Sequence, residues 1–198
     1  MVRIAADSLL PLEVYARERN AFRSRVMAHK KLRTVHAGDH VTLIFEDELT
    51  IRYQVQEMLR IERIAEEEGI RSELETYNPL IPDGANWKAT MLIEYPDAEE
   101  RRRRLAQLKG IEDRTWVAVD GFAHVYAIAD EDMERENEEK TSAVHFVRFE
   151  LERKMRDALQ RGADLTVGID HPNYRASVLV GPEVRRSLVG DLLAGDLA

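Results

Sequence analysis

The sequence predicts an α+β fold, in which helices pack on a mixed, largely antiparallel sheet of about six or seven strands. Three observations support this class: apolar segments typical of strands are joined in pairs by short turns, helical patterns lie between them and at both ends, and strict strand–helix–strand alternation is absent. The longest helices are expected near the N-terminus. With 198 residues, of which 44% are hydrophobic, the chain is expected to form a single domain over 1–198 with a substantial core.

Helices are predicted where apolar residues recur at three- and four-residue steps. Pro or a capping residue precedes several of these segments, and Gly follows several of them, as is usual at helix ends. Asp47, for example, is suited to cap the second helix, and Gly69 to end it. The helices are expected over 12–31, 48–68, 70–76, 96–110, 152–161 and 181–193.

Strands are predicted where apolar residues alternate or run continuously between turns. The turn sequences Asp120-Gly121 and His171-Pro172-Asn173 are each expected to join two strands into a hairpin. The charged stretch 131–140 is expected to be a solvated connection or a short helix. The strands are expected over 40–46, 87–95, two within 115–130, 142–151, 164–170 and 174–180.

Composition and charge exclude several classes of protein. The chain has no cysteine, which excludes disulfides, thiolate metal sites, Cys-ligated iron–sulfur clusters and a cysteine nucleophile. No apolar stretch is long enough for a signal peptide or a spanning helix, so a soluble, cytoplasmic protein without membrane association is expected. Net charge is −8, although residues 1–33 hold eight Lys/Arg and only three Asp/Glu. A basic helix folded against an acidic body explains this asymmetry, and nucleic acid binding is not expected.

The predicted helix over 48–68 combines an apolar stripe with polar groups that need partners. At about 100° per residue, Gln54 and Glu62 fall within the apolar arc. Glu57 and Arg60 lie on the opposite side, beside a second apolar patch that includes Tyr53. A buried carboxylate must be paired, protonated or bound to a cation. Two interpretations remain open: a polar pocket or metal site, or an internal salt-bridge network. In the second case the basic partners would come from Arg52, Arg60, Arg148 and Lys88.

Two further segments carry candidate binding residues. The stretch 78–88 contains two prolines and a glycine, which can hold a loop in one shape. This loop either presents Asn86 and Lys88 to a ligand or forms a rigid edge of the sheet, with Trp87 as a core anchor. His145 shares a predicted strand face with apolar residues, where a lone histidine is either a hydrogen-bonded core residue or a functional group.

Common catalytic and cofactor motifs are absent from the sequence. GxSxG, GxGxxG, GxxxxGK[ST], HExxH and Glu-x-x-His do not occur. His36 and His40 form a close pair, but zinc would require further ligands from elsewhere. No catalytic residue, cofactor or metal ligand is therefore assigned. The candidate ligand-binding residues are Tyr53, Gln54, Glu57, Arg60, Glu62, Asn86, Lys88 and His145.

Three long stretches of the chain resemble one protein family. They are "AHKKLRTV" with "FEDELTIRYQVQEMLRIERI", then "YNPLIPDGANWKATMLIEYPD", and then "ADEDMERENEEKTSAVHFVRFEL". Together they are similar to the bacterial domain-of-unknown-function family DUF3501, from near residue 8 to near residue 180. The resemblance implies genes that lie near those for rubrerythrin and for an iron–sulfur oxidoreductase subunit. It therefore implies a role near peroxide detoxification or electron transfer under oxidative stress, and it gives no residue a catalytic role.

Two kinds of function are expected from these observations. The first is an accessory or binding protein that works with rubrerythrin-type and iron–sulfur redox partners as a homodimer, which predicts an exposed apolar patch and no organised polar cleft. The second is an enzyme, or a small-ligand or metal-binding protein, with a polar pocket built on the helix over 48–68. The second predicts that the candidate side chains converge in one concave site. Because no catalytic constellation is visible, the sequence favours the first.

Overall fold

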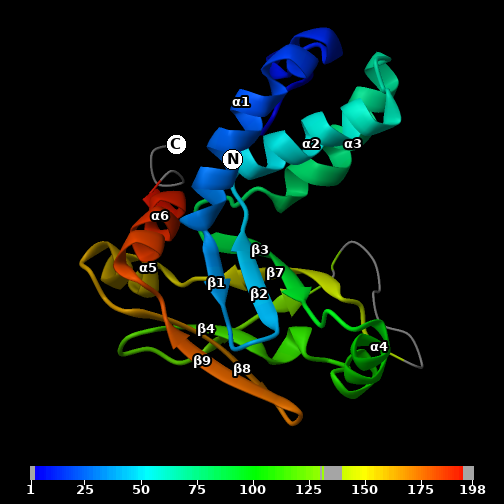
Figure 1. The fold of residues 1–198 in the computed structure, drawn as a ribbon. Helices are drawn as coiled ribbons and strands as arrows, with labels where there is room; N and C mark the ends of the chain where they lie inside the picture. Colours follow the sequence, from blue (N-terminus) through cyan, green and yellow to red (C-terminus); the bar gives the residue numbers. More distant parts are fainter. Residues whose placement is uncertain (1–2, 130, 132–139, 194–198) are drawn as a thin grey trace.

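The computed structural model describes residues 3–129, 131 and 140–193, and it confirms the α+β class. Six helices and three short 3-10 turns lie in this part of the chain (Figure 1). The helices are α1 (Leu12–Lys31), α2 (Glu48–Glu62), α3 (Glu67–Tyr77), α4 (Ala98–Gln107), α5 (Arg153–Gln160) and α6 (Pro182–Leu193). The 3-10 turns are η1 (Ala6–Ser8), η2 (Asn78–Leu80) and η3 (Glu112–Arg114). Among the described residues, no helix combines the length and apolar character needed to cross a membrane.

The strands form two antiparallel sheets instead of the one sheet that was expected. Sheet A has the order β1-β2-β3-β7-β6, and sheet B has the order β5-β4-β8-β9. The strands of sheet A are β1 (Thr34–His36), β2 (Val41–Phe45), β3 (Asn86–Ile93), β6 (Ile128–Ala129) and β7 (Val144–Glu150). The strands of sheet B are β4 (Thr115–Val119), β5 (Val125–Tyr126), β8 (Leu165–His171) and β9 (Tyr174–Leu179).

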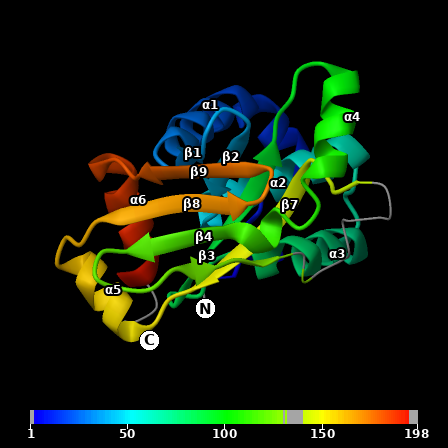
Figure 2. The same cartoon turned by 90° about the horizontal axis from the view of Figure 1, so that it is seen from below.

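The inner faces of the two sheets share one buried apolar cluster. Strand alternation places Phe45, Trp87 and Phe149 of sheet A in the same cluster as Val117 and Val167 of sheet B. Figure 2 shows sheet B from below, with sheet A behind it and α5 and α6 at one side. The indole nitrogen of Trp87 donates a hydrogen bond to a backbone carbonyl of α6 at 2.8 Å. Trp87 is therefore a core anchor, as one of the two interpretations of its loop required.

Helices α1, α2 and α3 form an arm that rises from the end of sheet A (Figure 1). The arm has its own apolar cluster, which includes Ile51, Val55 and Leu59 of α2 together with Leu74 of α3. Asp47 caps α2, as expected: its side chain accepts a hydrogen bond from the Thr50 N–H, and the Thr50 hydroxyl accepts one from the Asp47 N–H. This reciprocal cap fixes the direction in which α2 leaves the sheet.

The long helix expected over 48–68 is interrupted. It ends at Glu62, because Arg63 adopts a left-handed conformation with φ of 57°, and the next helix begins at Glu67. The Ile64 N–H then bonds to the Leu59 carbonyl at 2.9 Å, and the Ile64 side chain packs against the cluster of the arm. Gly69 leaves room for this side chain, since an added Cβ would lie 2.5 Å from Ile64 Cγ2. Tertiary packing therefore overrides the local helix preference of this stretch.

The segment 115–130 is divided between the two sheets. β4 and β5 pair across Asp120-Gly121, as expected, but the chain then crosses to sheet A, where β6 pairs with β7. The stretch 131–140, for which a connection or short helix was expected, lies outside the described residues apart from 131 and 140. The hairpin through His171-Pro172-Asn173 is confirmed by the pairing of β8 with β9.

Candidate functional site

The outer face of sheet A, which points away from sheet B, carries rows of side chains from neighbouring strands. Alternation along β2, β3 and β7 places every second side chain on this face. One row contains Glu46, Lys88 and Arg148, because the Glu46 N–H bonds to the Lys88 carbonyl and Lys88 is opposite Arg148. The next row contains Thr90 and Phe146. A row of charged side chains therefore lies directly beside a row that holds a hydroxyl group and an aromatic ring.

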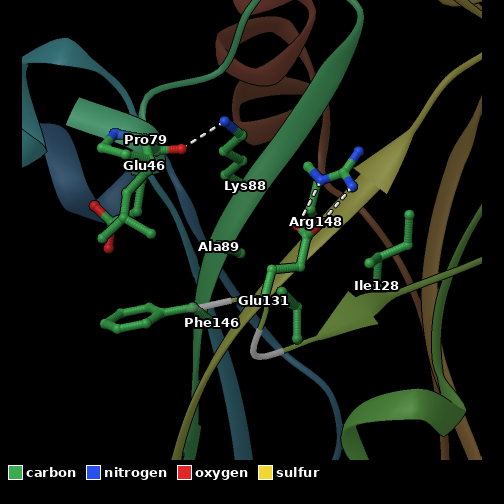
Figure 3. A pocket seen from close by; sticks show the side chains of 10 residues that line it. Glu46, Pro79, Lys88, Ala89, Ile128, Glu131, Phe146 and Arg148 are labelled. Carbon is green, nitrogen blue, oxygen red and sulfur yellow. Dashed lines mark hydrogen bonds and ion pairs between the residues drawn. The ribbon is translucent and has the colours of Figure 1, made fainter. Parts of the chain in front are cut away.

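A cleft with two lobes lies over these rows. Lobe 1, of about 320 Å³, lies over β3, β6 and β7 and includes Lys88 and Ile128 in its lining (Figure 3). Lobe 2, of about 240 Å³, lies between the sheet and the arm, and the arm contributes Thr50 and Tyr77 among others. Glu46, Leu80 and Phe146 line both lobes. The two lobes are therefore adjacent parts of one cleft.

Glu46 is the buried acid of this cleft, with 7% of its surface exposed. Its Oε2 accepts a hydrogen bond from the Thr50 hydroxyl at 2.5 Å, and its Oε1 accepts one from the Thr90 hydroxyl at 2.6 Å. The cap of α2 orients Thr50, and β3 orients Thr90, so two separate elements hold the carboxylate. Within the part of the chain that the structure describes, Glu46 forms no ion pair with a basic side chain. Among the described residues, the hydrogen-bond donors to its carboxylate are thus two neutral hydroxyls.

Two basic side chains lie beside Glu46 in the same row, and both are directed to other partners. The Lys88 ammonium donates hydrogen bonds to the backbone carbonyls of Pro79 and Ile81, and burial lowers its pKa. Arg148 binds Glu131 through two hydrogen bonds of 2.8 Å and also binds Glu150. In Figure 3, Glu46 lies on one side of the β3 ribbon and Arg148 on the other.

Six of the eight candidate residues are described first. They lie on or near the outer face of sheet A and the arm, and they fall into separate groups. Lys88 lines lobe 1 and Gln54 lines lobe 2. Asn86 is buried at the start of the central strand β3, where its side chain accepts a hydrogen bond from the Asp83 N–H and donates one to Glu150. The remaining three, Tyr53, Glu57 and Arg60, lie toward α1.

Glu57 joins α1 to α2. Its carboxylate accepts hydrogen bonds from the Tyr15 hydroxyl at 2.7 Å and from Arg19 at 2.8 Å, and Arg60 lies at 3.2 Å. Tyr53 takes part through its ring, whose centroid is 6.1 Å from that of Phe22 on α1. The hydrogen bond from Arg19 lowers the pKa of Glu57 from 4.5 to about 2, and those from Tyr15 and Arg60 act in the same direction. This is a structural network of the kind that the sequence left open, with Arg60 as an expected partner and Arg19 as an unexpected one.

Replacing Glu57 with alanine is expected to lower the free energy of unfolding by about 1.5–3 kcal/mol, the typical worth of hydrogen bonds to a charged group. The variant leaves the hydroxyl of Tyr15, which is 0% exposed, without its acceptor. The contribution of Glu57 is expected to be full above pH 4.5 and to be lost as the pH falls toward its folded-state pKa of about 2. Urea denaturation of the wild type and the variant at pH 7 and at pH 3 measures both effects.

Glu62→Ala is the matched control for this experiment. Glu62 is at the C-terminal end of the same helix and is exposed, so its replacement is expected to change stability by less than about 0.5 kcal/mol. Equal losses in the two variants would contradict a specific role of Glu57 in joining the helices.

Two positional expectations are corrected or resolved by the structure. The expectation that Glu62 is buried was wrong, because the helix ends at this residue and the side chain points to solvent. His145 is fully buried on the inner face of sheet A, with its Nε2 3.0 Å from the Thr141 hydroxyl and 3.1 Å from the Ser142 carbonyl. It lies on the opposite face of β7 from the cleft. The eight candidates therefore do not converge in one place.

The histidine pair of the turn after β1 is used for local contacts. His36 shares a hydrogen bond with the Thr42 hydroxyl, and His40 shares one with the Glu94 carbonyl while its ring stacks on Tyr95. Across the described residues, no group of three or more His, Cys, Asp or Glu side chains is arranged to hold a metal ion. The structure therefore offers no metal centre in this part of the chain.

Sequence reasoning missed the residues that join the two lobes. Glu46 stands first among three consecutive acids, and nothing in the sequence distinguishes it from Asp47 and Glu48. Phe146 alternates with His145 along β7 and was not considered as a wall of a site. The capping residues Asp47 and Thr50 were the available signal for Glu46. A threonine in the first turn of α2 lies within reach of the end of the preceding strand, where Glu46 is located.

Comparisons with known proteins identify a family and name no activity. A family model described as "Protein of unknown function (DUF3501)" matches residues 3–192. A crystal structure of a protein of unknown function from Burkholderia pseudomallei K96243 is 55% identical, covers 96% of this chain and 100% of its own, and superposes with a TM-score of 0.92. No curated protein matches the chain. The chain belongs to the DUF3501 family.

Proposed function

We propose that the protein binds a small organic molecule in the two-lobed cleft. Ligand sites in proteins are typically concave, largely apolar and provided with a few well-placed polar groups. The cleft has these properties: Leu80, Phe146 and Ile128 supply apolar surface, and Glu46 and Lys88 supply polar groups. The two volumes, about 320 and 240 Å³, are suited to a molecule of metabolite size.

The observation that carries this proposal is the buried carboxylate of Glu46, which has no ion pair among the described residues. A buried carboxylate without an opposite charge destabilises a folded protein, and buried charges are usually paired. Glu46 is held in place by Thr50 and Thr90, yet neither hydroxyl neutralises it. A group that is unfavourable for stability and is nevertheless positioned by two elements is typical of a binding site, where stability and function are in conflict.

Glu46→Gln is expected to stabilise the ligand-free protein by about 0.5–2 kcal/mol and to remove ligand binding. Glutamine keeps the shape of the side chain and removes the unpaired charge, and the threonine hydroxyl that faces its NH2 group must turn from donor to acceptor. Thermal and urea denaturation of ligand-free protein measure the first effect. A clear loss of stability would instead assign Glu46 to the structural framework and would contradict the proposal.

Glu94→Gln is the matched control. Glu94 also accepts a hydrogen bond from a threonine hydroxyl, that of Thr42 at 2.7 Å, but its side chain is exposed. Its replacement is expected to change neither stability by more than about 0.5 kcal/mol nor the binding of a ligand. The comparison separates the effect of buried charge from the general effect of removing a carboxylate beside threonine.

Native mass spectrometry of protein purified without chelator or affinity nickel identifies a retained molecule directly. A stoichiometric extra mass in the wild type that is absent from Glu46→Gln and present in Glu94→Gln supports the proposal. The same spectrum gives the number of chains in the assembly and so tests the homodimer that the sequence led us to expect. An extra mass retained equally by all three proteins would place the molecule elsewhere.

The association of this protein with rubrerythrin-type and iron–sulfur redox partners remains an expectation from the family resemblance. The exposed side chains of Ile128 and Val144 line the two lobes, so a partner that docks on this face of sheet A would also cover the cleft. Size-exclusion chromatography of the purified chain with a purified rubrerythrin-type protein tests this association. Loss of co-elution in an Ile128→Ser variant would place the contact on this face.

A further inference from the structure

We infer that the molecule bound at Glu46 carries a positively charged amine. The inference rests on the proposed function and adds the chemical class of the ligand. Its starting point is the unused capacity of the carboxylate, which has about four acceptor positions on its two oxygens. The hydroxyls of Thr50 and Thr90 occupy one position on each oxygen, so each oxygen keeps another position for a donor.

Two basic side chains close to Glu46 are directed to other partners, and a third, Lys30, lies in the same lobe without an ion pair to Glu46. Arg33 donates to the backbone carbonyl of Glu46 at 3.0 Å, but its ion pairs are with Asp191 and Asp47. Lys88 donates to backbone carbonyls of the loop that precedes β3. Lys30 lines lobe 2 and, among the described residues, forms no ion pair with Glu46. Among the described residues, the donors that reach this carboxylate are thus the two neutral hydroxyls, and a cationic ligand would bind it in place of Lys30.

The walls around Glu46 favour an organic cation over an inorganic one. Phe146 lines both lobes and Tyr77 lines lobe 2, and aromatic faces attract cations by about 0.5–2 kcal/mol. Figure 3 shows Glu46 and Phe146 on the same side of the β3 ribbon. Apolar surface from Leu80 then suits a hydrocarbon chain attached to the amine. An anionic ligand would be repelled by Glu46, and a neutral ligand would leave the buried charge unmatched.

Three six-carbon probes test the charge while keeping size and shape nearly constant: hexylamine, hexanol and hexanoate. Protein NMR titration in phosphate buffer, free of Tris and other amines, measures their dissociation constants. Hexylamine is expected to bind the wild type about tenfold more tightly than hexanol, as one charge-assisted hydrogen bond implies. Hexanoate is expected to bind more weakly than hexanol. In Glu46→Gln the advantage of hexylamine is expected to disappear, and in Glu94→Gln it is expected to remain.

The outcomes separate this inference from the proposed function. Equal binding of hexylamine and hexanol, or preferential binding of hexanoate, contradicts the inference that the ligand carries an amine. A neutral or acidic ligand would then remain for the same cleft. An amine preference that survives in Glu46→Gln also overturns the inference, because the cation would then be recognised elsewhere. If no probe perturbs the resonances of Leu80 and Phe146 at any concentration, both the inference and the proposed ligand site are contradicted.

Discussion

Replacing Arg33 with methionine is expected to lower the free energy of unfolding at pH 7 by about 3–5 kcal/mol, the usual effect of removing one member of a buried ion pair. Arg33 is only 1% exposed. Its guanidinium binds Asp191 of α6 at 2.5 Å, lies 3.5 Å from Asp47, and donates to the backbone carbonyls of Phe45 and Glu46. One side chain therefore joins the end of β2, the start of α2 and the last helix.

The loss is expected because methionine leaves the Asp191 carboxylate buried without a cation. Asp47 is less affected, since it keeps the Thr50 N–H at 2.9 Å and His29 at 2.5 Å. Urea denaturation of the wild type and of Arg33→Met measures the difference. The exposed Arg102→Met is the control and is expected to change stability by less than about 0.5 kcal/mol.

A double variant, Arg33→Met with Asp191→Leu, separates lost attraction from an orphaned charge. It is expected to recover a large part of the stability, because an apolar pair of similar volume often replaces a buried ion pair without loss. If the double variant were as unstable as the single one, the backbone carbonyls that Arg33 serves would be the main source of the effect. If the single variant lost less than about 1 kcal/mol, water would have to solvate the Asp191 carboxylate in the variant.

Arg33 also illustrates what local sequence patterns can and cannot predict. The sequence predicts the first helix to end at 31, as observed, and it associates the basic residues there with the helix dipole. Exposed bases at a helix end satisfy that pattern equally well, so nothing local distinguishes the buried Arg33 from Lys30 and Lys31. Its burial depends on Asp191, which is 158 positions further along the chain. Only the folded arrangement brings them together.

The fold was predicted more completely than the site for the same reason. Periodicity is a local property, and it located the strands of both sheets apart from the three-residue β1 and the division of the second strand within 115–130 into β5 and β6. It also located the starts of α1 and α2, which Pro11 and Asp47 precede. It failed at Arg63, where Ile64 turns back into the cluster of the arm without a Gly or Pro at the break. The division into two sheets depends on strand pairing between distant segments, which periodicity does not contain.

The candidate site depends almost entirely on such distant contacts. Lys88 and Gln54 line the two lobes of the cleft, whereas the other six candidates line neither lobe, so the single pocket expected for all eight does not form. Glu57 and Glu62 were treated alike because both are acids on one helix. The structure gives Glu57 three partners and places Glu62 in solvent. Glu46 acquires its role from Thr90, 44 positions away, so its importance is a property of the sheet and not of its neighbours in sequence.

Asp191 is expected to make the protein more stable as the pH is lowered from 6 toward 3.8. Burial raises the pKa of this carboxyl from 3.8 to about 6, although Arg33 acts in the opposite direction. Between these two values the folded state binds more protons than the unfolded state, so the free energy of unfolding decreases as the pH rises. The full contribution of Asp191 is present below pH 3.8 and is lost above about pH 6. A shift of this size corresponds to about 3 kcal/mol.

Asp191→Asn isolates this contribution, because asparagine does not titrate and the other groups largely cancel in the difference. The stability of the wild type relative to Asp191→Asn is expected to rise by about 3 kcal/mol between pH 7 and pH 4, as measured by urea denaturation at several pH values. Asp164→Asn is the control: Asp164 is bonded to Arg185 but is 65% exposed, so no comparable dependence is expected. A difference that falls on acidification would mean that attraction to Arg33 outweighs the effect of burial. With a pKa of about 6 for Asp191, Arg33→Met is expected to lose more stability at pH 7 than at pH 4, because the pair is ionised only at the higher pH, which links the two experiments.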